Sequence, residues 1–277
     1  MKSLPTIAVD GAKLVYRRIG KGRPLLVLNG FGATSADWDP SFIDRLASCN
    51  ELILLNNRGI GGSTDEGQPF DIAKLAADAA HVIETLGIER VSVMGWSMGG
   101  FVAQALALKC PDRINNLVLL STDPGGIEAD LAAPDIWSEL IDTSGTPNEQ
   151  ARRLLFLLFP KDVAESFYRQ FGDMVAMARA QLSVELLNRQ AAAMDAWHRN
   201  GVATQLREIR VPVLIATGTE DIVIPASNSL KLVNAIPGAW LAQFPHGGHA
   251  FMAQYPRALA NLINSFLAVD GSALWPV

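Results

Sequence analysis

The chain has 277 residues, of which 49% are hydrophobic and 18% charged, and its formal net charge is −5. This composition excludes a disordered chain, and the scattered basic residues offer no electrostatic footprint for nucleic acid or an anionic membrane. The length fits one α/β domain with an insertion better than two equal domains. We therefore expect a globular protein with one main hydrophobic core.

Membrane and metal partners are not expected either. The longest aliphatic and aromatic run, Leu154–Phe159, is far shorter than the roughly 20 residues that span a bilayer. Residues 1–5 lack the hydrophobic stretch of a secretory signal, which predicts a cytoplasmic protein. Cys49 and Cys110 are the only cysteines. Since neither belongs to a Cys-x-x-Cys pair, we expect two buried thiols and no thiolate metal site.

Short β-like runs open the chain and then give way to an alternating pattern. Residues 7–9 and 13–18 flank Asp10-Gly11, which is a strong hairpin signal. Residues 24–28 form the last of these opening runs, and the later apolar runs, separated by helical stretches, are residues 52–55, 91–94, 117–120, 213–216 and 240–244. Apolar spacing predicts a helix that ends near Gly87 and another that begins near Pro256. This rhythm indicates an α/β fold with a mostly parallel central sheet covered by helices on both faces.

The rhythm stops between residues 124 and 207, where helix-forming residues rich in Ala, Leu, Met and aromatics take over. We interpret this segment as a helical cap inserted into a core domain made of residues 1–123 and 208–277. Most of its large side chains are expected to form the interior of the cap itself. The candidates for lining an apolar substrate pocket are Trp137, Phe159 and Trp197.

One motif carries the chemistry. Gly95-Trp96-Ser97-Met98-Gly99 matches Gly-x-Ser-x-Gly, a pattern that a chain of this composition contains by chance about 0.1 times. It directly follows the apolar run 91–94 and directly precedes a helical stretch, which is the strand, sharp turn and helix that a nucleophile elbow requires. Ser97 is therefore the candidate nucleophile.

A serine hydroxyl needs a base and the base needs a carboxylate. Among the four histidines, His249 is favoured because it follows Gly247-Gly248 in the loop between the last predicted strand and the last helix. His246 in the same loop is less favoured. Asp221, just beyond the run 213–216, is the candidate acid, and Asp123, just beyond 117–120, is its rival.

The oxyanion of an acyl-transfer reaction needs two aligned N–H donors. The Met98 N–H is placed at the start of a helix, where free amides favour negative charge. The turn Asn29-Gly30-Phe31-Gly32 follows the strand 24–28, and its glycines allow the Phe31 N–H to approach Ser97. Phe31 and Met98 are therefore the predicted donors.

These residues resemble the α/β-hydrolase superfamily, from the opening hairpin to the final helix. The order Ser97, Asp221, His249 is similar to the family's order of nucleophile, acid and histidine. The segment 56–63, Asn-Asn-Arg-Gly-Ile-Gly-Gly-Ser, looks like the family's Asp-x-Arg-Gly-x-Gly-x-Ser loop. Two positions depart from the family pattern, since Asn29 stands where many relatives have His and Asn56 where the loop usually begins with Asp.

Within this superfamily the serine nucleophile argues against the haloalkane dehalogenases and epoxide hydrolases, which use Asp at the elbow. The residues look closest to small carboxylesterases, 3-oxoadipate enol-lactonases and cofactor-free haloperoxidases, a likeness that implies a serine hydrolase of a small ester or lactone with no metal or other cofactor. Alternatives are a C–C bond hydrolase of aromatic degradation, a peptidase similar to proline iminopeptidases, and a non-catalytic small-molecule receptor on the same fold. The sequence leaves open whether the protein forms a homo-oligomer.

Overall fold

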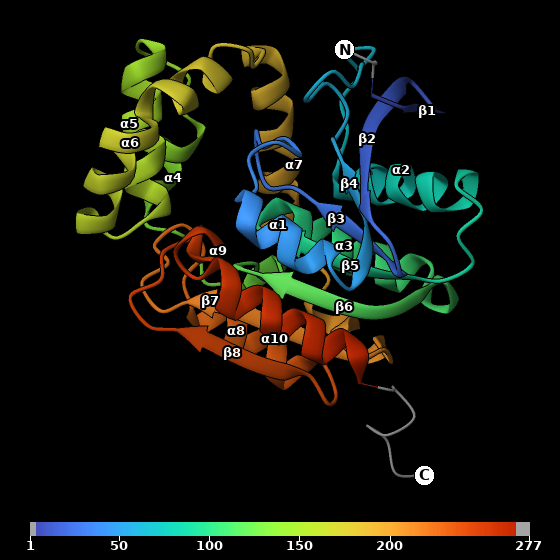
Figure 1. Ribbon diagram of the computed structural model, residues 1–277. Helices are drawn as coiled ribbons and strands as arrows, with labels where there is room; N and C mark the ends of the chain where they lie inside the picture. The colour runs from blue at the N-terminus through green and yellow to red at the C-terminus, as the bar shows by residue number, and fades with distance from the viewer. Residues whose placement is uncertain (1–3, 270–277) are drawn as a thin grey trace.

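The computed structural model describes residues 4–269 and is built on one eight-stranded sheet flanked by helices (Figure 1). The strands are β1 (Thr6–Val9), β2 (Ala12–Gly20), β3 (Arg23–Leu28), β4 (Asn50–Leu55), β5 (Val91–Trp96), β6 (Ile114–Leu120), β7 (Val213–Gly218) and β8 (Trp240–Phe244). Their order in the sheet is β1-β2-β4-β3-β5-β6-β7-β8. The predicted α/β fold is confirmed.

The direction of the strands places the loops that carry the chemistry. β1 and β2 form the predicted hairpin, in which Val9 pairs with Ala12, and β2 also runs antiparallel to β4. All the remaining neighbours are parallel. The carboxyl ends of β3 to β8 therefore meet at one edge of the sheet, which is where open α/β sheets bind their ligands.

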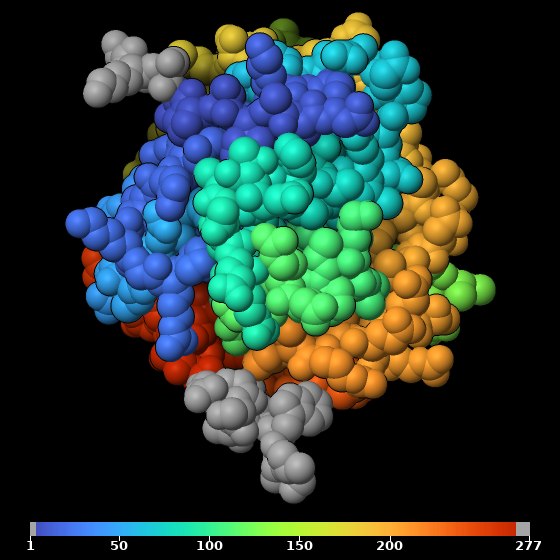
Figure 2. Space-filling model, turned by 90° about the vertical axis from the view of Figure 1, so that its right-hand side faces the viewer, coloured from blue at the N-terminus to red at the C-terminus, as the bar shows by residue number. Residues whose placement is uncertain are grey.

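Helices cover both faces of the sheet and bury its apolar side chains. α2 (Ile72–Thr85), α3 (Met98–Lys109) and α8 (Ser227–Ala235) bury apolar side chains against one face, and α1 (Pro40–Ala47) and α10 (Pro256–Ala268) against the other. Figure 2 shows the first hairpin in blue, the α2 region in blue-green, the α3 region in green and the α8 region in orange, one below another. A short helix, α9 (Phe251–Gln254), precedes α10, and a 3-10 turn, η1 (Pro111–Arg113), precedes β6.

The end of α2 illustrates how the sequence specifies its own helix boundaries. Gly87 adopts a φ of +66°, a conformation that costs glycine little, and its N–H donates to the Glu84 carbonyl at 2.9 Å. The Ile88 N–H donates to the Ile83 carbonyl at 3.1 Å. These two bonds satisfy carbonyls of the last turn, so the predicted stop at Gly87 is confirmed.

Four helices lie between β6 and β7, beyond the carboxyl edge of the sheet (Figure 1). They are α4 (Pro134–Ile141), α5 (Pro147–Leu158), α6 (Lys161–Arg179) and α7 (Val184–Asn200), flanked by the 3-10 turns η2 (Gly126–Glu128) and η3 (Ala203–Glu208). All four fall inside the segment 124–207, which we call the cap. Within residues 4–269 no helix has the length and apolarity that crossing a membrane requires.

The expectation of two buried thiols is wrong. Cys49 is exposed and Cys110 is half-buried, and both are free. Each follows the last residues of a helix, Cys49 after α1 and Cys110 after α3, where the chain turns back toward a strand at the amino edge of the sheet. Both thiols therefore lie in short connections outside the hydrophobic core.

Candidate active site

The turn between β5 and α3 holds Ser97 in a strained conformation, with φ 55° and ψ −124°. A Cβ at Gly95 would overlap the Gly99 carbonyl oxygen, and one at Gly99 would overlap the Leu28 carbonyl oxygen. Only glycine fits at either position because the first turn of α3 packs directly on the ends of β5 and β3. The Gly-x-Ser-x-Gly pattern thus follows from the tightness of the turn that carries Ser97.

The structure brings Asp221 and His249 together. Asp221 lies just beyond β7 and His249 lies between β8 and α9, and His249 Nδ1 is 2.8 Å from Asp221 Oδ2. The other carboxylate oxygen, Oδ1, accepts the N–H groups of Val223 at 3.0 Å and Ile224 at 2.9 Å. Asp221 is 6% and His249 2% exposed. Three donors therefore satisfy a buried carboxylate, which in turn holds the imidazole by Nδ1 and leaves Nε2 for chemistry.

Trp96 ties the histidine loop to the elbow. Its indole Nε1 donates to the His249 carbonyl at 3.0 Å, and its ring lies 5.5 Å from the imidazole. On its other side Trp96 meets Trp38 edge-on at 5.9 Å. Since Trp96 directly precedes Ser97, these contacts fix the position of His249 relative to the nucleophile.

The turn after β3 lies against the nucleophile. A Cβ on Gly30 would sit 3.3 Å from Ser97 Cβ. The Phe31 N–H in this turn has no hydrogen-bond partner within residues 4–269, and the Met98 N–H is the first of α3, where no intrahelical partner exists. The Met98 N–H is thus at the elbow itself, and the Phe31 N–H belongs to a turn that touches the elbow at Gly30.

The asparagines that depart from the family pattern use both ends of their amide groups. Asn29 Nδ2 donates to the Leu55 carbonyl at 2.7 Å, and its Oδ1 accepts the Trp38 indole N–H at 2.6 Å. This fully buried amide holds the start of the oxyanion turn. Asn56 Oδ1 accepts the Ser35 N–H at 2.7 Å, and its Nδ2 donates to the Gly61 carbonyl at 2.8 Å. A carboxylate could not make either donation.

The loop that Asn56 begins is anchored by a buried ion pair. Arg58 lies 2.8 Å from an Asp78 oxygen, and both side chains are at most 5% exposed. Burial raises the pKa of Asp78, and the hydrogen bond from Arg58 opposes that rise. The pair joins the loop to α2.

The cap also reaches the oxyanion turn. The Gly32 N–H donates to Gln190 Oε1 of α7 at 2.8 Å, and Gln190 is fully buried. The Arg179 guanidinium of α6 lies close to the same glycine. Burial lowers the pKa of Arg179, and the nearby charge of Arg153 lowers it further. Sequence reasoning missed Gln190, because no pattern in α7 distinguishes a side chain that crosses to the core.

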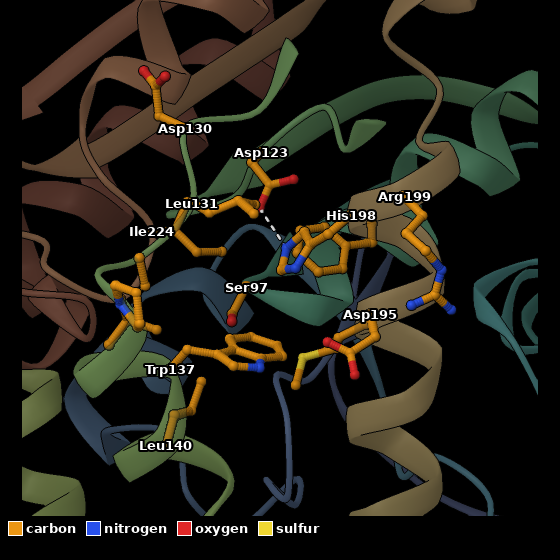
Figure 3. Close-up of a pocket in the computed structure, with 15 residues that line it drawn as sticks. Ser97, Asp123, Asp130, Leu131, Trp137, Leu140, Asp195, His198, Arg199 and Ile224 are labelled. Atoms are coloured by element: carbon orange, nitrogen blue, oxygen red, sulfur yellow. Dashed lines mark hydrogen bonds and ion pairs between the residues drawn. The ribbon is translucent and has the colours of Figure 1, made fainter. Parts of the chain in front are cut away.

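Ser97 opens into a cavity of about 370 Å³ between the core and the cap (Figure 3). Its apolar lining consists of Phe101, Leu131, Ala132, Pro134, Trp137, Leu140, Met194, Val223 and Ile224, and its polar lining of Ser97, Asp123, Asp130, Asp195, His198 and Arg199. No group of three or more His, Cys, Asp or Glu side chains within residues 4–269 is arranged to hold a metal ion.

Of the three predicted pocket residues, the structure places only Trp137 in the lining of this cavity. Phe159 and Trp197 are each 6% exposed. Phe159 stacks on Phe167 at 4.4 Å, and Trp197 stacks behind the lining residue Phe101 at 5.1 Å. Trp197 therefore packs behind the cavity wall and Phe159 packs against the cap residue Phe167, so neither lines this cavity, contrary to the expectation.

Two other histidines, His246 and His198, belong to other pairs. His246, with Nδ1 2.9 Å from Glu220 and Nε2 3.1 Å from Asp162, joins the loop after β8 to the cap. The hydrogen bond with Glu220, and after it the one with Asp162, raises the pKa of His246. Asp123, the rival acid, lies with Oδ2 3.3 Å from Nε2 of His198 on α7. No sequence signal pointed to this second carboxylate and imidazole pair.

Comparison with known proteins shows the family to which the chain belongs. The family model of the alpha/beta hydrolase fold matches residues 23–254. The chain is 30% identical to a protein of Azorhizobium caulinodans named as the carbamate hydrolase RutD, over 92% of this chain and 95% of that one. It is 28% identical to a protein of Mycobacterium tuberculosis named as the non-heme bromoperoxidase BpoC, over 92% and 97%. The enol-lactonase of Burkholderia xenovorans superposes with a TM-score of 0.81 at 24% identity, covering 96% of this chain and all of that one. The chain therefore belongs to the α/β-hydrolase family of hydrolytic enzymes.

Proposed function

We propose that the protein is a serine hydrolase that cleaves a small carboxylic ester or lactone through an acyl-enzyme on Ser97. The observation that carries the proposal is the buried Asp221–His249 pair, joined at 2.8 Å, on loops held against the strained elbow of Ser97. This arrangement supplies a nucleophile, a base and a group that orients the base.

In the proposed reaction, Ser97 Oγ attacks the carbonyl carbon while His249 Nε2 takes the hydroxyl proton. The negative charge moves to the carbonyl oxygen, where the N–H groups of Phe31 and Met98 stabilise it. One such donor contributes about 3 kcal/mol to the barrier reduction. The intermediate then expels the alkoxide oxygen, to which His249 returns the proton. Water, deprotonated by His249, attacks the acyl-enzyme and releases the acid and free Ser97 by the same steps.

The cavity supports a small substrate with an apolar body. Its volume of about 370 Å³ is at the lower end of the range for small-molecule sites, and most of its lining residues are apolar. The enol-lactonase named above acts on a lactone, and RutD is named for a carbamate, so both relatives support attack on an acyl carbon that bears an oxygen or nitrogen leaving group.

The test is a set of initial rates on p-nitrophenyl acetate, butyrate and octanoate, an enol-lactone, a meta-cleavage dienone and a proline p-nitroanilide. Ser97→Ala should abolish ester and lactone turnover while the far-UV spectrum is unchanged. Ser121→Ala is the matched control, because Ser121 also follows a parallel strand with a positive φ of 43°, and its buried hydroxyl has no partner within residues 4–269.

Each alternative has its own outcome in this panel. Turnover of the dienone alone would move the protein to the C–C bond hydrolases, and turnover of the anilide alone to the peptidases similar to proline iminopeptidases. Ligand binding without any turnover would favour a small-molecule receptor. Ester turnover that survives in Ser97→Ala would refute the proposal.

A further inference from the structure

The cavity at Ser97 contains a second carboxylate and imidazole pair that the proposed acyl transfer does not use. Asp123 follows β6, and His198 lies near the end of α7 in the cap. His198 Nε2 is 3.3 Å from Asp123 Oδ2, and both residues line the cavity together with Ser97 (Figure 3). The pair thus faces the same space in which the substrate of Ser97 would bind.

The hydrogen bonds around Asp123 favour Nε2 as the nitrogen of His198 that carries the proton. Asp123 is 1% exposed, and its Oδ1 accepts the Gly125 N–H at 2.8 Å and the Trp197 indole N–H at 3.2 Å. Donors surround this carboxylate as they surround a buried charge, so Oδ2 accepts from His198 Nε2–H. In the neutral ring the other nitrogen, Nδ1, then carries a lone pair and is a hydrogen-bond acceptor.

Aromatic side chains hold the ring that presents this acceptor. Phe101 meets the imidazole edge-on with ring centres 5.7 Å apart, and Trp137 does so at 5.2 Å. Within residues 4–269 Nδ1 makes no hydrogen bond, whereas Nε2 is held by Asp123. The ring is therefore oriented in advance by three neighbours and has one nitrogen left for a ligand.

The other polar groups of the wall are differently placed. The Asp130 carboxylate is held by Lys231 at 2.6 Å and by the Ser227 hydroxyl at 2.6 Å. Arg199 follows His198 on α7 and is exposed, and Asp195, one turn earlier on the same helix, is half-buried and has no hydrogen bond that orients it within residues 4–269. Among the polar lining residues, His198 is enclosed by aromatic rings and oriented by a buried carboxylate. In a mostly apolar pocket, an oriented polar group of this kind can fix the ligand through a hydrogen bond.

We propose that His198 is a substrate-binding residue, and that the substrate carries a hydroxyl or amide N–H that donates to His198 Nδ1. This inference rests on the proposed function and narrows its substrate class to an ester or lactone with such a donor group. Asp123 is the positioning residue, because it acts by orienting the ring. A site built around a hydrogen bond discriminates against analogues that lack the bonding group, because its own polar atom is then left unpaired.

The experiment compares matched substrates with and without a hydroxyl on each side of the scissile bond. On the acyl side p-nitrophenyl 3-hydroxybutyrate carries the hydroxyl and p-nitrophenyl butyrate lacks it, and p-nitrophenyl hemisuccinate tests for an anion site. On the alcohol side 2-hydroxyethyl butyrate carries the hydroxyl and propyl butyrate lacks it. The wild type should prefer one of the two hydroxylated esters by about 10-fold in kcat/KM, the size expected for one hydrogen bond. His198→Phe should remove that preference mainly through KM, and His198→Gln, whose amide can still donate and accept, should keep part of it.

A control variant separates recognition from anchoring of the cap. Trp197→Phe removes another hydrogen bond from α7 to Asp123, but Trp197 does not line the cavity. The Gly125 N–H still donates to the same Asp123 oxygen in this variant, so the hydroxyl preference should be retained even if the melting temperature falls. Equal losses on every substrate in Trp197→Phe and His198→Phe would refute the proposal, since the pair would then only anchor the cap. A preference for the hemisuccinate that depends on His198 would refute it as well, in favour of an anion site.

A binding measurement keeps this inference separate from the proposed function. Calorimetric titration of Ser97→Ala with the propyl and 2-hydroxyethyl esters requires no turnover. Tighter binding of the hydroxylated ester, lost in the Ser97→Ala, His198→Phe double variant, would support the site even if no ester is hydrolysed. Equal binding of the two esters, together with no hydroxyl preference in the rates, would overturn it.

Discussion

Replacing Asp221 by Asn should lower the reaction rate without lowering the stability of the fold. Asp221 Oδ1 accepts two backbone N–H groups, from Val223 and Ile224, and Oδ2 faces His249 Nδ1 at 2.8 Å. An Asn amide must direct its oxygen at the two N–H groups, since its NH₂ would meet them donor to donor. The NH₂ group therefore faces Nδ1, which has to become an acceptor, and the imidazole proton moves to Nε2. In the proposed mechanism Nε2 then has no lone pair with which to accept the Ser97 proton.

The size of the effect follows from this reversed tautomer. The same substitution in the triad of a serine protease lowers kcat by about 10⁴-fold with intact geometry, which corresponds to about 5 kcal/mol of barrier. We expect a loss of this order in kcat for a p-nitrophenyl ester. The melting temperature should change little, because Asn preserves the volume and both sets of contacts. A loss below about 10-fold in a folded Asp221→Asn variant would refute the assigned role.

Two further predictions concern the contacts between cap and core. Gln190→Leu leaves the Gly32 N–H without its acceptor and should lower kcat by roughly 10-fold with little change in KM. Gln190→Glu keeps an acceptor for this N–H and should retain most activity. Equal kcat values for the two variants would contradict the positioning role of Gln190. The second concerns pH. Hydrogen bonds with Glu220 and Asp162 raise the pKa of His246 in the folded protein. The contribution of His246 to the free energy of unfolding is therefore fully present below about pH 6.5, which is the pKa of histidine in the unfolded chain. This contribution is lost as the pH rises through the raised pKa. The urea midpoint of the wild type should therefore exceed that of His246→Gln most at about pH 6, and the two midpoints should converge toward about pH 9. A difference in midpoint that increases with pH would contradict this pH dependence.

The parts of the fold that depend on neighbours in the chain were predictable. The eight strands, the Asp10-Gly11 hairpin and the stop of α2 at Gly87 all rest on patterns spanning a few residues. The elbow was recognisable from its short motif, although only the contact of Gly95 with Gly99 is local and Gly99 itself is required by the distant Leu28 carbonyl. Parallel strands then bring Asp221 and His249 to the same edge, so chain order was enough to suggest that they meet.

The cap could not be predicted at the level of single side chains. Trp137, Phe159 and Trp197 look alike as aromatic residues on helices, and only the packing of α4, α5 and α7 decides that the first lines the cavity and the others do not. The partners of His198 depend in the same way on where α7 meets the loop after β6. Asn29 was marked as a departure from a family pattern, but its two hydrogen bonds link residues that are distant in the chain.

The most direct test of the account is to trap the acyl-enzyme. The enzyme is mixed with excess p-nitrophenyl butyrate, quenched in acid within milliseconds, and analysed by intact mass and peptide mass spectrometry. We predict a butyryl adduct on the peptide that contains Ser97, absent in Ser97→Ala and present in Ser121→Ala. Ester turnover with no adduct on Ser97, or with an adduct on another residue, would contradict the central claim.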